Sequence, residues 1–83
     1  MTREQSRAAR GLLGWTQDDL AKKSRVSVTT IRNFERGASQ PIAVTLEAMQ
    51  RALEAGGVNF IAENGGGLGV RLKLKSSERQ RGA

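Results

Sequence analysis

The sequence predicts a mainly α-helical domain of four to five helices, followed by a C-terminal β-hairpin. Up to residue 57, four segments combine apolar residues at helical spacing with a capping residue or a glycine at one or both ends. After residue 57, two β-prone runs flank a glycine-rich loop. We therefore expect a helical domain at residues 1–57, a hairpin at residues 58–75 and a flexible tail at residues 76–83.

The first helix is expected over residues 1–13. Thr2 is its predicted N-cap, with Gln5 three residues later as the partner in a capping box. Gly14 ends the helix, because glycine tolerates the left-handed backbone conformation found there. Thr16 caps the second helix and is followed by two aspartates, which the helix dipole stabilises in the first turn.

Ser27 is the predicted cap of the third helix, which ends at Gly37. A fourth helix runs from about residue 42 or 43 to residue 55, and Gly56 and Gly57 terminate it. Apolar residues in these helices recur at spacings that place them on one face. The side chains expected to face the core are Leu20, Ala21, Ile31, Phe34, Leu46, Met49 and Leu53.

The hairpin joins residues 58–62 to residues 68–74 around an Asn-Gly turn signal. Its apolar stripe is too long for an isolated two-stranded ribbon in water, so it must cover either the chain's own helices or a partner chain. We favour dimerisation, and packing on the chain's own fourth helix is the alternative. The expected dimerisation residues are Val58, Phe60, Val70, Leu72 and Leu74.

The chain has 83 residues, and its 14 Lys and Arg outnumber 8 Asp and Glu to give a net charge of +6. This balance favours a polyanionic partner, with nucleic acid ahead of an anionic membrane surface. The sequence contains no Cys and no His. We therefore expect no metal, no cofactor, no catalytic residues and no enzymatic activity.

No apolar run approaches the roughly 20 residues of a membrane span, and no signal-peptide pattern opens the chain. We therefore expect a cytoplasmic protein with no membrane contact. A bacterial or phage origin would suit its small size.

Residues 16–37 read as two short helices joined by a tight turn. This is the layout of a helix-turn-helix, whose second helix enters the major groove of DNA. Hydroxyl, carboxamide and guanidinium groups are the side chains that read base edges, and positions 29, 32, 33 and 36 share one helical face. The expected base contacts are Val28, Thr29 and Asn33, the expected backbone contacts are Thr30 and Arg36, and Arg32 is assigned to either.

The segment from about residue 6 to residue 53 resembles the phage repressor and Cro type of helix-turn-helix, also called the Xre family. The resemblance rests on W-T-Q-x-x-L-A at residues 15–21 and V-S-x-x-x-I-x-x-F-E-R-G at residues 26–37. It implies a repressor-like domain in which Gln17 grips DNA at the start of the second helix. The helix N-terminus there also suits a phosphate.

The same resemblance implies that Arg10 and Glu35 form an internal ion pair between the first and third helices. The family usually has glycine in the turn where this chain has Arg25. If that position keeps a positive φ, a non-glycine residue costs roughly 1–2 kcal/mol. Either the turn is reshaped or Arg25 gains a phosphate contact.

These observations together predict a sequence-specific transcriptional regulator. The simplest form is a homodimeric repressor that binds double-stranded DNA at an inverted-repeat operator with half-sites about 34 Å apart, and its own promoter is one candidate target. The alternative is an antitoxin that binds DNA and also a protein toxin, with the tail as the toxin-binding segment.

Overall fold

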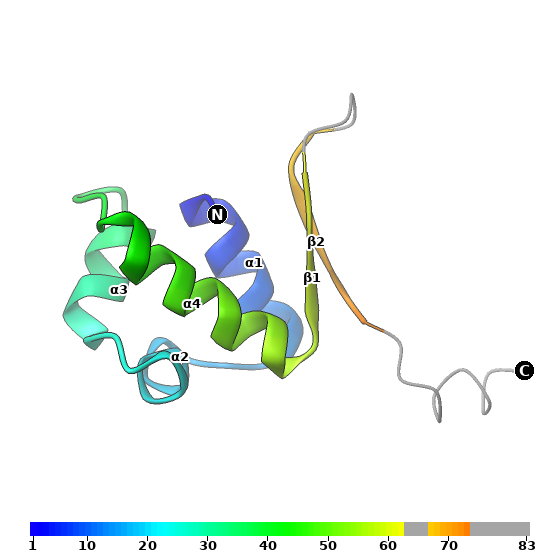
Figure 1. The fold of residues 1–83 in the computed structure, drawn as a ribbon, viewed down its shortest axis with the longest axis horizontal. Helices are drawn as coiled ribbons and strands as arrows, with labels where there is room; N and C mark the ends of the chain where they lie inside the picture. Colours follow the sequence, from blue (N-terminus) through cyan, green and yellow to red (C-terminus); the bar gives the residue numbers. More distant parts are fainter. Residues whose placement is uncertain (63–66, 74–83) are drawn as a thin grey trace, which may run out of the picture.

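The structure is a computed structural model that describes residues 1–62 and 67–73. In this part of the chain four helices precede an antiparallel hairpin (Figure 1), which confirms the predicted fold class. Leu74 and the expected tail lie outside the described residues. The helices are α1 (Arg3–Leu13), α2 (Gln17–Ser24), α3 (Val28–Glu35) and α4 (Ala43–Gly56), and the strands are β1 (Val58–Ile61) and β2 (Gly69–Leu72).

The predicted capping residues set the helix starts. Thr2 accepts a hydrogen bond from the Gln5 backbone and completes a capping box, and Thr16 does the same with Asp19. Because Thr2 is extended, α1 begins at Arg3, two residues later than predicted. Each box satisfies two backbone N–H groups that a helix start leaves without an intrahelical partner.

One hydrophobic core joins the helices to the hairpin. The fully buried predicted side chains come from α2, α3 and α4, and Val58 of β1 is buried among them. Burying one such large apolar side chain stabilises the folded state by about 1.5–3 kcal/mol. Of the apolar residues in α1, Ala9 is buried and Leu13 packs against the core, whereas Ala8 and Leu12 are exposed.

The hairpin packs on its own helices, chiefly α1 and also α4. Val58 pairs with Leu72 and Phe60 with Val70 across the two strands. In Figure 1 the hairpin lies on the side of the helical domain opposite α3. The packing on α1 was not foreseen, because nothing in a strand's alternation identifies the helix that it covers.

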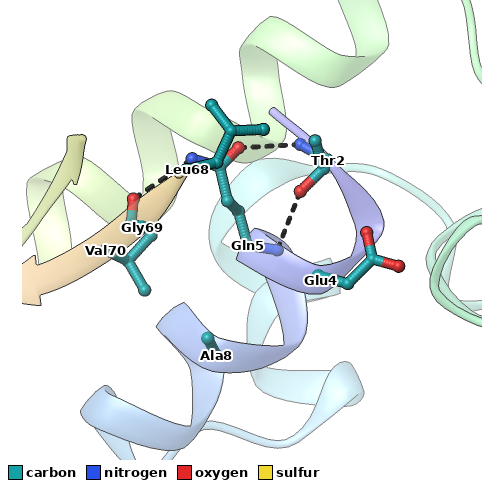
Figure 2. Close-up of a pocket in the computed structure, with 7 residues that line it drawn as sticks. All are labelled: Thr2, Glu4, Gln5, Ala8, Leu68, Gly69 and Val70. Atoms are coloured by element: carbon teal, nitrogen blue, oxygen red, sulfur yellow. Dashed lines mark hydrogen bonds between the residues drawn. The ribbon is translucent and has the colours of Figure 1, made fainter. Parts of the chain in front are cut away.

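One side chain ties β2 to the start of α1. The Oε1 atom of Gln5 accepts from the Thr2 backbone N–H at 2.9 Å, and its Nε2 atom donates to the carbonyl oxygen of Gly69 at 3.1 Å (Figure 2). Gln5 is 7% exposed, and both ends of its amide therefore have the partners that a buried amide requires. The capping box and the docking of the hairpin thus share one residue.

The turn between α2 and α3 keeps the left-handed conformation despite its non-glycine residue. Arg25 has φ 60° and ψ 29°, and its backbone N–H donates to the Ala21 carbonyl at 2.9 Å. It is the one non-glycine residue with positive φ among the described residues. The turn is therefore not reshaped, and the side chain of Arg25 is exposed.

We predict that Arg25→Gly stabilises the fold. Glycine relieves the left-handed strain of roughly 1–2 kcal/mol, and the gain is reduced by about 0.4–1 kcal/mol because glycine gives the unfolded chain more freedom. Urea unfolding should show that the free energy of unfolding rises by less than about 1.5 kcal/mol relative to the wild type. Gly14→Ala is the matched reverse change, because Gly14 has φ 69° and open space around it, and it should destabilise. A loss of stability in Arg25→Gly would contradict the strain argument.

Candidate nucleic-acid interface

A buried carboxylate joins the three helices that form the candidate interface. Glu35, at the end of α3, is 2% exposed. Arg10 of α1 grips it with Nη2 at 2.6 Å from Oε1 and Nε at 2.9 Å from Oε2. Ser6 donates to Oε2 at 2.6 Å, and Gln17 of α2 donates to Oε1 at 3.2 Å. One carboxylate therefore fixes α1, α2 and α3 relative to one another.

The charge of Glu35 is retained in this environment. Burial raises the pKa of Glu35, but hydrogen bonds from Arg10, Ser6 and Gln17 and the Arg10 charge outweigh burial and lower the pKa below its ordinary value of 4.5. No buried side-chain nitrogen or oxygen of the described residues lacks a hydrogen-bond partner. Removing one partner of such a buried pair typically costs about 3–5 kcal/mol.

Two further contacts from α1 hold the neighbouring helix ends. Arg7 donates to the backbone carbonyl of Glu35, one of the carbonyls that a helix end leaves without an intrahelical partner. Arg10 donates through Nη1 to the carbonyl of Trp15 at 3.1 Å, just before α2 begins. Sequence reasoning missed the roles of Ser6 and Arg7, because a serine and an arginine at these positions are equally typical of a solvated helix face.

The outward face of α3 collects the side chains predicted to meet DNA. Ile31 and Phe34 are buried and anchor the opposite face of the helix. The Ser27 hydroxyl accepts from the backbone N–H of Thr30 at 3.1 Å and so caps the start of α3. On the outward side Thr29, Arg32 and Arg36 are exposed, and Val28, Thr30 and Asn33 are half-buried.

The arginines near this face carry charges that the described chain does not neutralise. Arg25, Arg32 and Arg36 form no ion pair within residues 1–62 and 67–73. The ion-paired arginines of the same residues, on α1 and α4, are Arg3, Arg7, Arg10 and Arg51. Unpaired guanidinium groups on one surface are what a phosphate backbone would neutralise.

Two predicted positions are already engaged within the chain. The Nε2 atom of half-buried Gln17 faces Glu35, which holds the side chain at the first residue of α2. The Oδ1 atom of Asn33 accepts from Nε and Nη2 of Arg36 at 3.1 and 3.0 Å. Neither contact was foreseen, because each depends on the rotamers of two side chains, which their spacing in the sequence does not predict.

Strands β1 and β2, which carry the described members of the predicted dimerisation set, lie on the other side of the domain from α3 (Figure 1). Val58 is fully buried in the chain's own core, and Phe60 and Val70 are half-buried. Leu72 is 48% exposed. Leu74 lies outside the described residues.

Comparison with known proteins agrees with this geometry. A family model described as helix-turn-helix matches residues 7–60, which is well over half of the chain. No curated protein matches the chain significantly. Among the described residues, no helix is long and apolar enough to cross a membrane, and no group of three or more potential acidic ligands gathers to hold a metal ion.

The lowered pKa of Glu35 predicts a specific loss of stability in acid. A carboxyl group with a depressed folded-state pKa contributes stability that is present above its ordinary value and is lost as the pH falls through the lowered value. Urea unfolding of the wild type and of Glu35→Gln should therefore differ most near pH 7 and converge below the ordinary value. Glu4 and Asp19 also have lowered pKa values, but both proteins contain them, so their contributions cancel in the difference between the two unfolding free energies. Parallel pH profiles would contradict the lowered pKa of Glu35.

Proposed function

We propose that this chain, which belongs to the Xre/Cro-like helix-turn-helix family of DNA-binding transcriptional regulators, acts as a dimeric repressor on an inverted-repeat operator. Occupying a promoter is the simplest mode of repression for a helix-turn-helix domain, and the promoter of its own gene is the simplest target. The observation that supports this proposal is the outward face of α3, where polar side chains and unpaired arginines lie together.

The start of α3 is the part assigned to reading sequence. In a helix-turn-helix the N-terminal residues of the second helix reach the base edges. Val28 and Thr29 occupy the first two positions of α3, and the exposed Thr29 offers both a hydroxyl group and a methyl group. The methyl group suits a thymine methyl, and the hydroxyl group accepts or donates according to the base.

Phosphate contacts are assigned to residues that surround this reading end. Gln17 lies at the N-terminus of α2, where backbone N–H groups favour an anion. Arg25, in the turn, and Arg32, on the face of α3, have no ion-pair partner in the described part of the chain. Thr30 completes the set from the half-buried flank of α3. Such contacts fix the register of the protein on DNA without selecting a sequence.

The hairpin is assigned to dimerisation because it leaves apolar surface in water away from α3. Leu68 and Leu72 are 52% and 48% exposed. Leu68 also lines a groove between α1 and β2, and the exposed Ala8 contributes to the wall of this groove (Figure 2). A second copy covering this surface would remove the leucines from water and leave both α3 helices free.

We predict that selection from a random duplex pool at about 0.15 M salt enriches an inverted repeat. Thr29→Ala should lose about 1–3 kcal/mol on the enriched site and relax one base position. Gln17→Ala should weaken all duplexes alike, because it removes a phosphate contact. Arg51→Ala, an exposed change on α4, controls for substitution outside the proposed DNA surface. If no motif is enriched, the proposed operator binding is wrong.

We predict that Leu72→Glu converts the dimer to a monomer, because it puts a charge into the apolar contact. Val44→Glu is the matched control, since Val44 is 65% exposed on α4. Sedimentation equilibrium should show loss of the dimer in the first variant alone. Deleting the hairpin is a poorer test, because it removes the buried Val58 from the core.

A dimer that survives Leu72→Glu but not Val44→Glu would place the interface on α4 instead. A monomeric wild type would exclude the homodimer and leave the exposed strand to a different protein, as the antitoxin alternative requires.

A further inference from the structure

The carboxamide oxygen of Asn33 is already occupied in the free protein. Its Oδ1 atom accepts two hydrogen bonds from one guanidinium group, from Nε of Arg36 at 3.1 Å and from Nη2 at 3.0 Å. A carbonyl oxygen of this kind has two lone pairs, and the two bonds use both of them. The two residues are three apart, which places them on neighbouring positions of one helical face.

This occupancy conflicts with reading of adenine by Asn33. Bidentate recognition requires the amide oxygen to accept from adenine N6 while the amide nitrogen donates to N7. Asn33 can do both only if it first releases Arg36. The contact that sequence reasoning assigned to Asn33 would therefore break an interaction that the folded chain already makes.

The same interaction leaves a defined part of Arg36 free. Nε and one N–H of Nη2 are directed at Asn33, so both N–H groups of Nη1 and the second N–H of Nη2 remain. These form an end-on fork that matches two adjacent acceptor atoms. No carboxylate of the described residues forms an ion pair with Arg36, and its side chain is exposed.

The position of Arg36 favours phosphate oxygens over a base as the acceptors. Arg36 is the C-cap of α3, with φ −89° and ψ 0°, where the chain leaves the helix. The reading end of such a helix is its N-terminus, so its C-terminal end faces the flanking backbone. Arg32, four residues earlier on the same face, adds a second unpaired cation.

The backbone that carries this pair is itself fixed. The carbonyl oxygen of Asn33 accepts from the backbone N–H of Ala38 at 2.8 Å and from that of Ser39 at 3.3 Å. The backbone N–H of Arg36 donates to the carbonyl of Arg32 at 3.0 Å. A guanidinium held from a fixed backbone loses less conformational freedom on binding than a free one.

We propose that Asn33 is a positioning residue, which acts through Arg36 by holding its guanidinium fork toward a DNA phosphate. This inference rests on the proposed function, in which the face of α3 binds DNA. It changes the role of Asn33 from selecting a base to orienting a sequence-independent contact, and it makes Arg36 a principal phosphate ligand of this end of α3.

A double-mutant cycle tests the proposal. Asn33→Ala, Arg36→Ala and the double variant are titrated against the duplex enriched by selection and against a mixed-sequence duplex of about 30 base pairs over a range of salt concentrations. Arg36→Ala should weaken both duplexes about tenfold and reduce the slope of log K against log salt by about 1. Asn33→Ala should weaken both about threefold, and the double variant should match Arg36→Ala.

Two further variants separate positioning from charge. Arg36→Lys keeps the charge but has no fork for Asn33 to hold, so adding Asn33→Ala to it should change nothing. Arg51→Ala removes an equal charge from α4 and should leave the slope nearly unchanged.

Additive losses in the cycle would overturn the proposal. So would relaxation of a single base position by Asn33→Ala, since that is the behaviour of a base reader. A wild type that binds neither duplex would instead remove the proposed DNA-binding surface itself, and the inference would fall with it.

Discussion

The ion pair between Arg10 and Glu35 is the interaction on which the rest of this structure depends. The helix that carries the candidate DNA surface, α3, has eight residues, and helices of this length are not stable alone in water. Its apolar side holds it to the core, but apolar contact does not fix rotation or tilt. The directed hydrogen bonds of Arg10, Ser6 and Gln17 to one carboxylate supply that orientation. Because Gln17 also begins α2, the same carboxylate sets the position of the candidate phosphate contact relative to α3.

The fold separates two kinds of surface. Unpaired arginines and polar side chains lie on α3, whereas exposed leucines lie on the hairpin at the opposite side (Figure 1). Gln5 connects the hairpin to the helical domain, because it completes the cap of α1 and holds β2 against that helix. A chain of 83 residues has little core to spare, and the burial of Val58 shows that the hairpin contributes to it. The same small element is therefore available for stability and, under our proposal, for assembly.

The sequence predicted what depends on local rules and left open what depends on distant contacts. Thr2, Thr16 and Ser27 were recognisable as helix caps because capping needs only a few neighbouring residues. The αL conformation at Arg25 was anticipated as one of two outcomes, since its strain follows from backbone sterics alone. The bond from Gln5 to Gly69 spans 64 residues, and no local pattern encodes it. The Asn33–Arg36 pair is local, but the sequence assigned each side chain to DNA separately, because their spacing does not predict the rotamers that join them.

The most direct test of the central claim, that the outward face of α3 and the start of α2 form the DNA surface, is a map of backbone amide shifts by NMR. A mixed-sequence duplex is titrated into uniformly ¹⁵N-labelled protein at low salt, where phosphate contacts are strongest. The account predicts that the largest shifts fall on Gln17, on the turn at Arg25 and along α3. Shifts concentrated on β1 and β2, with α3 unchanged, would contradict it.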